Sequence, residues 1–228
     1  MDQYPSITDS LGEDELRDIE RSTKKIAIEQ LFRNGLRAIL FNIINPVILA
    51  LIFLSQTNHV YIYIWLGALI LLSVLRYAHI LNRLPQLTTD KAAASKCAVE
   101  FIGAASLTGL LWGTGFLILG PLLTTVNQII FLLVLAGMAA GAYASMSSHR
   151  LTYACYLLSI FIPVLLSLFM TSNAAIPGDM LGLFIVVFVG MLLVTHKQSN
   201  TIILNSIRSE LVKNLLIKKL QHAETENS

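Results

Sequence analysis

Long apolar runs separated by short polar stretches dominate the chain. Each run is continuous rather than alternating, which indicates helices and not membrane-spanning strands. A helix needs about 20 apolar residues to cross a bilayer, with a range of roughly 17 to 25. We therefore predict an all-α fold, that of a polytopic membrane protein with a six-helix transmembrane bundle. The six predicted spans are 38–55, 60–75, 98–119, 128–146, 152–170 and 177–194.

Composition and charge agree with a membrane domain between two polar ends. Of 228 residues, 55% are hydrophobic and only 13% are charged, whereas soluble domains carry roughly 25% charged residues. We predict a cytoplasmic amphipathic leader at 1–36, a transmembrane domain at 37–196 and a cytoplasmic helix at 197–228. The net charge of +2 is too small to indicate a nucleic-acid partner, and the lipid bilayer is the expected one.

The basic residues predict the orientation. With six spans, all sixteen Lys and Arg fall on one side of the membrane, and the positive-inside rule makes that side cytoplasmic. We expect a multi-pass protein of the bacterial inner membrane with both termini in the cytoplasm. Arg76 is expected to snorkel to the inner surface. The sixteen are Arg17, Arg21, Lys24, Lys25, Arg33, Arg37, Arg76, Arg83, Lys91, Lys96, Arg150, Lys197, Arg208, Lys213, Lys218 and Lys219.

Aromatic side chains near the span ends predict interfacial belts. Trp65 is expected in the outer belt, and Tyr153 and Tyr156 in the inner one. The outer loops are short, which excludes a large extracellular ligand-binding domain. A signal must therefore enter through the membrane or bind between the helices.

Two G-x-x-x-G spacings predict close helix packing. Gly109 and Gly113 share a face of the third span, and Gly137 and Gly141 share a face of the fourth. Such faces let two backbones approach closely, so we expect these two spans to pack together; a homodimer interface is the alternative. Pro163 predicts a kink in the fifth span, which is either packing geometry or a hinge.

Polar residues inside the spans are few. Asn42 and Asn45 are three residues apart and share one face of the first span, where they either bond a neighbouring helix or bind a ligand. With Trp112 they are the candidate ligand-binding residues. Glu100 and Asp179 begin spans near opposite surfaces, and we expect both to be solvated.

No catalytic or metal-binding pattern is visible. His79, His149 and His196 lie near the inner surface, but no two have ligand spacing on one helix, so neither metal nor cofactor is expected. Cys97 and Cys155 are expected to pack rather than react. There is no nucleophile elbow, P-loop or pair of catalytic acids, and we expect no enzyme activity from these residues.

Both polar ends have helical patterns. Ser10 and Glu13 fit a capping box at the start of an amphipathic helix that leads into the first span. After the sixth span the chain continues without Pro or Gly, and apolar residues recur at three- and four-residue steps. We expect a signalling helix and a homodimer through it; an amphipathic tail on the membrane is the alternative. This C-terminal seam consists of Leu204, Ile207, Leu211 and Leu215.

These features resemble the multi-helix membrane sensor region at the N-terminus of bacterial hybrid histidine kinases and GGDEF-type diguanylate cyclases. The resemblance covers roughly residues 25–228. It implies a module that senses a signal in or near the bilayer and passes it to a cytoplasmic output domain. The matching pieces are Gly109-Leu-Leu-Trp112-Gly113, Leu135-Ala-Gly137, Ser147-Ser148-His149-Arg150, Phe161-Ile-Pro163, Asn205 to Leu220, and the closing Leu220 to Ser228.

We therefore expect a sensory, signal-transducing membrane module that acts through a cytoplasmic output domain or partner protein. No kinase or cyclase motif precedes Ser228, so the output is expected in a longer chain or from a partner. A small transporter or channel is the alternative, with Asn42, Asn45, Glu100 and Asp179 as its polar lining. A membrane scaffold that binds no ligand is a third possibility.

Overall fold

Six long helices build the molecule. The computed structural model describes residues 12–57, 59–89, 93–170 and 178–226, and these contain no strand. Each long helix is apolar enough to cross a membrane, which confirms the predicted count, and each contains one predicted span to within two residues. The elements are α2 (Glu13–Phe53), α3 (His59–Thr89), α4 (Ala93–Leu119), the 3-10 turn η1 (Gly120–Leu122), α5 (Thr125–Ser145), α6 (Arg150–Met170) and α7 (Gly178–Glu226).

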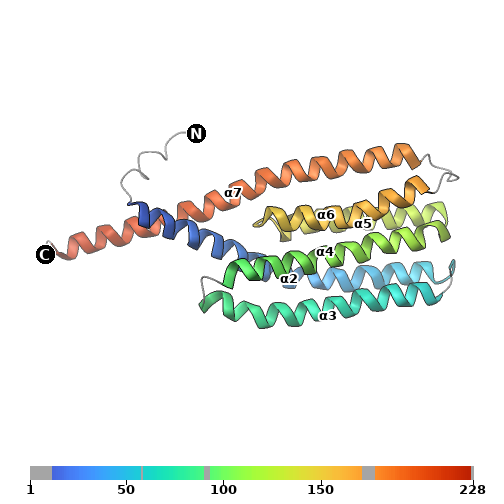
Figure 1. The fold of residues 1–228 in the computed structure, drawn as a ribbon, viewed down its shortest axis with the longest axis horizontal. Helices are drawn as coiled ribbons and strands as arrows, with labels where there is room; N and C mark the ends of the chain where they lie inside the picture. The colour runs from blue at the N-terminus through green and yellow to red at the C-terminus, as the bar shows by residue number, and fades with distance from the viewer. Residues whose placement is uncertain (1–11, 58, 90–92, 171–177, 227–228) are drawn as a thin grey trace.

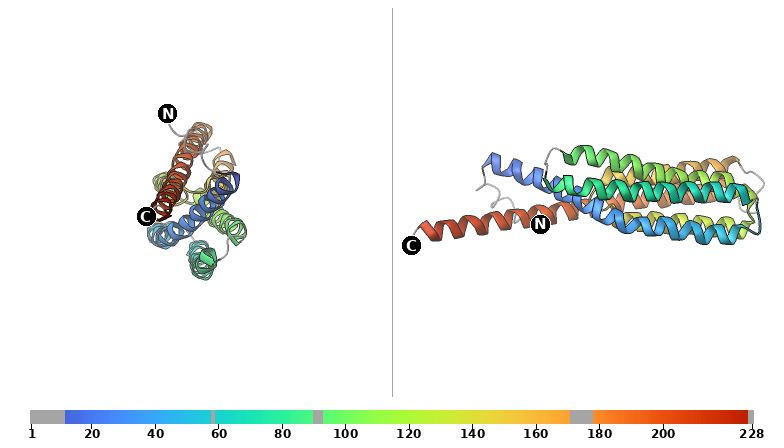
Figure 2. Two further views of the ribbon diagram at one scale, coloured as in Figure 1. Left: turned by 90° about the vertical axis from the view of Figure 1, so that its left-hand side faces the viewer. Right: turned by 90° about the horizontal axis from the view of Figure 1, so that it is seen from below.

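The helices lie side by side in an elongated bundle (Figure 1). We call the end at which α3 leads to α4 and α5 turns into α6 the basic end, and the opposite end the far end. Both α2 and α7 extend past the bundle at the basic end, as Figure 2 also shows. The described chain therefore begins and ends on the same side.

The two extended helices run without a break from the bundle into the projection. The 41 residues of α2 and the 49 of α7 pass through the predicted domain boundaries at 36/37 and 196/197. Beyond the bundle α2 and α7 pack together, and Lys219 Nζ lies 2.7 Å from a carboxylate oxygen of Glu15. At 1.5 Å per residue α7 is about 74 Å long, more than twice the hydrocarbon thickness.

The start of α2 differs from the predicted cap. The helix begins at Glu13 after Gly12, and the Gly12 amide donates to the Glu15 carboxylate at 3.1 Å. The predicted cap residue Ser10 lies outside the described residues. The Glu15 carboxylate, three residues after Gly12, therefore caps the start of the helix. This role was predicted for the pair Ser10 and Glu13.

The two glycine pairs have different surroundings. A Cβ added to Gly109 would lie 2.7 Å from the Tyr156 carbonyl oxygen, and one at Gly113 would overlap the Ile160 carbonyl. This pair therefore places α4 directly against α6, and Pro163 is buried within α6 nearby. A Cβ at Gly137 or Gly141 would meet no atom within 4 Å.

The predicted glycine-mediated packing of the third and fourth spans is therefore wrong. These spans, α4 and α5, meet instead through large side chains, with the ring centroids of Phe116 and Phe131 5.4 Å apart. A ring of this size fills the space between two helix axes, so neither backbone needs to approach the other. Gly109 and Gly113 of α4 pack against α6 instead.

Three aromatic residues predicted for the interfacial belts lie inside the bundle. Trp65 is 7% exposed and donates its indole N–H to the Leu111 carbonyl at 3.1 Å. It lies against Gly115, where an added Cβ would overlap the indole. Tyr153 and Tyr156 are also buried. A glycine on the neighbouring helix makes room for the ring, which the pattern of one span does not show.

Two charged residues also differ from expectation. Arg76 does not snorkel but is 4% exposed; it donates to Thr108 Oγ1 at 2.9 Å and lies over the Phe101 ring. Glu100 is not simply solvated, because Arg83 Nη2 lies 2.7 Å from one of its carboxylate oxygens. His79 Nε2 lies 3.3 Å from the other oxygen. Each polar group finds a partner on a neighbouring helix, as groups removed from water must.

Candidate functional site

The three candidate ligand-binding residues come together in the structure. The Trp112 indole N–H of α4 donates to Asn42 Oδ1 of α2 at 3.0 Å. Asn45, one turn further along α2, donates to the Met138 sulfur of α5 at 3.0 Å. The shared face of the two asparagines thus joins α2 to two different helices, and the first of the two predicted roles, bonding to a neighbour, is observed.

A cluster of aromatic rings holds Trp112 in place. The Trp65 and Trp112 rings meet edge to face with centroids 5.5 Å apart. Phe131 of α5 packs against both of them and against Phe116. Edge-to-face pairs add stability beyond their buried area. Asn42 is therefore bonded to a rigid partner, and the position of its side chain depends on how α2 packs against α4.

A cavity of about 400 Å³ opens between α2 and α5. Asn42 and Asn45 line it, and Trp112 orients Asn42 without lining it. The side chains missing from Gly137 and Gly141 leave room for it. We call it the α2–α5 cavity. It extends toward the basic end, where its lining consists of Asn34, Arg37, Ala38, Phe41, Arg76, Ala142, Ala144, Ser145, Met146 and Tyr156.

The lining of the α2–α5 cavity is apolar with a few polar groups, as in sites that bind small molecules. Arg76 brings a guanidinium to its wall, and among the described residues no carboxylate is within ion-pair distance of it. Arg37 lies at the end of the cavity nearer to the projection. Together with the asparagine amides, these groups suit an amphipathic molecule with an anionic or carbonyl-bearing end.

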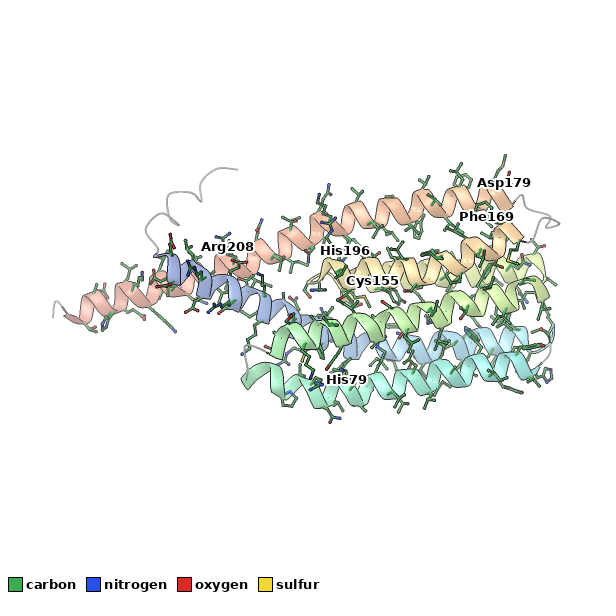
Figure 3. All side chains as sticks on the ribbon, in the orientation of Figure 1. His79, Cys155, Phe169, Asp179, His196 and Arg208 are labelled. Carbon is green, nitrogen blue, oxygen red and sulfur yellow. The ribbon has the colours of Figure 1, made fainter. Side chains whose placement is uncertain are left out.

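A second feature fixes α7 to the rest of the bundle at the level where it leaves it (Figure 3). The His196 ring stacks on Tyr153 with centroids 4.1 Å apart, and Tyr143 packs edge-on against it. His196 Nε2 lies 3.2 Å from the Met146 carbonyl oxygen. A carbonyl only accepts, so Nε2 carries the proton in this arrangement.

One turn later, Asn200 completes the attachment. Its side-chain amide donates to the Ser147 carbonyl at 2.8 Å. Met146 and Ser147 follow the last turn of α5. Backbone carbonyls at the end of a helix receive no hydrogen bond from an N–H group of that helix. His196 and Asn200 are four residues apart and share a face of α7. Two side chains of α7 thus cap the end of α5, and we call this contact the α5–α7 cap.

The turn between α5 and α6 is itself well ordered by hydrogen bonds. His149 Nδ1 lies 2.8 Å from Thr152 Oγ1, and the Thr152 amide donates to the same nitrogen at 3.4 Å. Burial lowers the pKa of His149 from its usual value, because water no longer stabilises the charged ring. An Nδ1 that accepts from an amide also requires the neutral form.

The C-terminal seam is partly covered within the chain itself. All four of its residues are half-buried where α7 runs beside α2, and α2 buries Ile19, Thr23 and Ala27 in the same projection. The two helices cover part of each other's apolar surface. The exposed apolar residues of this part of α7 are Ile202, Ile217 and Leu220.

Sequence reasoning missed Arg76, His196 and Asn200 as important residues. From the sequence His196 was considered only as a possible metal ligand, whereas in the structure it is 1% exposed and belongs to the α5–α7 cap. The available signal was the i, i+4 pair of polar residues immediately after the sixth apolar run. Among the described residues, no three His, Cys, Asp or Glu side chains are grouped as metal ligands.

Comparison with known proteins gives no assignment. No family model matches this chain, and neither a curated protein nor a solved structure matches it. The function is therefore inferred from the chain's own residues.

Proposed function

We propose that this chain is a membrane-embedded sensor module that relays a membrane or small-molecule signal to a cytoplasmic output domain or partner protein. In this proposal it lies in the bacterial inner membrane with both termini in the cytoplasm. The observation that carries the proposal is the continuity of α7. One helix runs from the far end of the bundle into the projection and is held to α5 at the point of exit.

The α2–α5 cavity and α7 are mechanically linked in two ways. The cavity lies between α2 and α5. The end of α5 is capped by His196 and Asn200 of α7, while the projecting half of α2 packs along α7. A molecule that separates or tilts α2 and α5 therefore acts on α7 from both sides. A stiff helix carries such a shift along its axis to whatever follows it.

The alternative, a small transporter or channel, has less support among the described residues. Of its four predicted lining residues, Asn42 and Asn45 line the α2–α5 cavity, but Glu100 and Asp179 do not. Glu100 is paired with Arg83, and Asp179 is exposed near the far end (Figure 3). A path across the membrane needs polar groups at successive depths, and the two acids are instead separated at opposite ends.

The proposal includes a homodimer, but with interface residues other than those of the C-terminal seam. Because α2 half-covers the C-terminal seam, a second copy would contact the exposed residues Ile202, Ile217 and Leu220. Cysteines placed at Ile217 and Leu220 should then cross-link between copies in membranes more than cysteines at Leu211 and Leu215. The background lacks Cys97 and Cys155. Equal or weaker cross-linking at Ile217 and Leu220 would contradict this interface.

A reporter fusion tests the sensor proposal. A diguanylate cyclase catalytic domain is fused in helical register after Ser228, and Gly137→Trp is introduced to fill the α2–α5 cavity. The matched control is Gly103→Trp, since Gly103 is an exposed helical glycine of α4 with no atom near its Cβ position. Only Gly137→Trp should change cyclase activity, by about fivefold or more if coupling resembles other allosteric proteins.

The α5–α7 cap provides the second arm of this test. His196→Phe keeps a ring against Tyr153 but removes the bond to the Met146 carbonyl. It should greatly reduce the difference between Gly137→Trp and Gly103→Trp. Identical cyclase activity in the two tryptophan variants, at equal membrane levels of protein, would overturn the proposal and favour a transporter or scaffold.

A further inference from the structure

A second cavity, of about 760 Å³, lies at the basic end of the bundle. Four segments meet around it: the projecting half of α2, the first turns of α4, the α5–α6 turn with the start of α6, and α7 just past the α5–α7 cap. We call it the basic cavity. Its lining residues are Arg21, Lys24, Lys25, Ala27, Ile28, Ala94, Ser95, Ala98, Ser148, His149, Arg150, Leu151, Asn200 and Leu204.

The charge of the basic cavity is of one sign. Arg21, Lys24 and Lys25 contribute cations from α2, and Arg150 contributes one from the start of α6. None of the described residues that line it is acidic. Lys24 Nζ lies 2.7 Å from a carboxylate oxygen of Glu20, which does not line the cavity. Basic side chains gathered from two elements around a concave space attract an anion more strongly than a flat basic surface does.

Two helix starts add to this field. Ala94 and Ser95 belong to the first turn of α4, and Arg150 and Leu151 to the first turn of α6. Amide groups in a first turn have no acceptor within their own helix, and the helix dipole places partial positive charge there. Both helices exceed twenty residues. Phosphate groups commonly bind at such helix starts.

A buried hydroxyl without a partner points to a ligand independently of the charge. Ser148 is 2% exposed and lines the cavity, and among the described residues its Oγ has no hydrogen-bond partner. Leaving a buried hydroxyl unbonded costs about 1 to 3 kcal/mol. Its neighbours are satisfied, because Ser147 accepts from Asn200 and His149 bonds Thr152. The hydroxyl is free to bond a bound oxyanion.

We propose that the basic cavity binds a phosphate group, held by the side chains of Arg21 and Arg150, the Ser148 hydroxyl and the backbone amides of Arg150 and Leu151. The cavity lies at the basic end among α2, α4, α6 and α7, which is the level of lipid phosphates if that end is cytoplasmic. The phosphate can therefore come from an anionic lipid headgroup or from a soluble phosphorylated molecule. Binding would join α2 to the α5–α6 turn and the start of α6, and it requires no signalling role of the chain.

Two probes distinguish the sources. The full chain is purified in detergent micelles, and native mass spectrometry measures binding of phosphatidylglycerol with phosphatidylcholine as the zwitterionic reference. Calorimetry at low salt measures binding of inorganic pyrophosphate. Selective binding of phosphatidylglycerol identifies a lipid headgroup as the source, and binding of pyrophosphate identifies a soluble molecule. Either result supports a phosphate site, and failure of both probes to bind overturns it.

Three variants assign the binding to the cavity. Arg150→Gln should weaken it about tenfold or more, because a charge-assisted bond is lost. Ser148→Ala should weaken it several-fold without lowering the melting temperature, because the hydroxyl has no partner before the ligand binds. Lys197→Gln is the control, since Lys197 is an exposed cation just before the same level of α7 and does not line the cavity.

The control decides between a site and a general attraction to basic surface. Loss of affinity in Lys197→Gln equal to that in Arg150→Gln would overturn the proposal. If Arg150→Gln fails to fold, as judged by gel filtration, Ser148→Ala decides: unchanged affinity in a stable Ser148→Ala protein also overturns it.

Discussion

The G-x-x-x-G spacings of α4 and α5 have opposite surroundings in the structure. On α4, Gly109 and Gly113 lie against the backbone of α6, so close that a Cβ at either position would collide with a carbonyl. On α5, Gly137 and Gly141 line the α2–α5 cavity, and a Cβ added at either position would meet no atom within 4 Å. A G-x-x-x-G spacing therefore shows that a helix has a smooth face, and the neighbouring helix decides whether that face is filled.

The comparison divides the bundle into a tight part and an adjustable part. The α4–α6 interface has no room for an added methyl group, and such interfaces resist deformation. Among the described residues, the α2–α5 interface has the Asn45 to Met138 hydrogen bond and the Phe53–Phe131 ring contact beside the open space of the cavity. We expect movement of α2 and α5 against a fixed α4–α6 unit.

The largest expected effect on stability comes from adding one methyl group at the tight α4–α6 interface. Gly113→Ala should destabilise the protein by about 3 kcal/mol, because α6 must move away from α4. Gly137→Ala should change stability by less than about 1 kcal/mol, and in the stabilising direction, since alanine favours the helix. Unfolding in mixed micelles followed by circular dichroism measures both. Equal losses would contradict the division into tight and adjustable parts.

The next effect concerns the buried guanidinium on the wall of the α2–α5 cavity. Arg76→Leu should leave stability unchanged or raise it by about 1 kcal/mol, because a buried charge without a carboxylate is costly. Thr108 keeps its bond to the Ala104 carbonyl in this variant.

Arg83→Leu is the contrasting variant on the same helix. It leaves His79 as the remaining ion-pair partner of the half-buried Glu100 among the described residues, and it should lower stability by about 1 to 2 kcal/mol. The same unfolding experiment compares the two. A loss in Arg76→Leu as large as that in Arg83→Leu would show that Arg76 holds the fold rather than serving the cavity.

A smaller effect is expected at the joint between the two parts. A double-mutant cycle with Asn42→Leu and Trp112→Phe should give a coupling energy of about 1 kcal/mol, the size typical of hydrogen bonds between membrane helices. Additive losses, with no coupling, would mean that the bond between α2 and α4 contributes nothing to holding Asn42 at the cavity.

The smallest effect lies in the projection. The bond to Lys219 lowers the pKa of Glu15 below its ordinary value of 4.5, so this contact stabilises above that value and is lost as pH falls through the lower folded pKa. The protection of the last turns of α7 against hydrogen exchange, after correction for the intrinsic rate at each pH, should then fall only below about pH 4.5. Glu15→Gln should show faster exchange at pH 7, while Glu13→Gln, whose partner Arg17 lies on its own helix, should not.

The sequence predicted the six helices well because each span satisfies its backbone within itself, and length and hydropathy report that directly. Asn42, Asn45 and Trp112 could be selected because polar and aromatic groups inside a span need partners. Which helices meet could not be predicted. The burial of Trp65 depends on Gly115 of another span, and the α5–α7 cap depends on carbonyls that any sequence could provide.

The basic cavity was hidden for a related reason. From the sequence, Arg21 and Arg150 indicate membrane orientation, but they are far apart in the chain and fall in different predicted parts. Ser148 and Arg150 belong to one of the pieces that carry the family resemblance, yet no pattern in the sequence places them beside Arg21. The fold, by returning α2 and α7 to the same end as the α5–α6 turn, brings these groups together.

The central claim is that the filling of the α2–α5 cavity moves α7 relative to the α4–α6 unit. Double electron–electron resonance measures the distance between spin labels at Lys96 of α4 and Lys213 of α7, in a chain without Cys97 and Cys155. We predict that Gly137→Trp shifts the distance distribution and that Gly103→Trp leaves it unchanged. Superimposable distributions in both variants would contradict the claim and leave α7 as a fixed part of the scaffold.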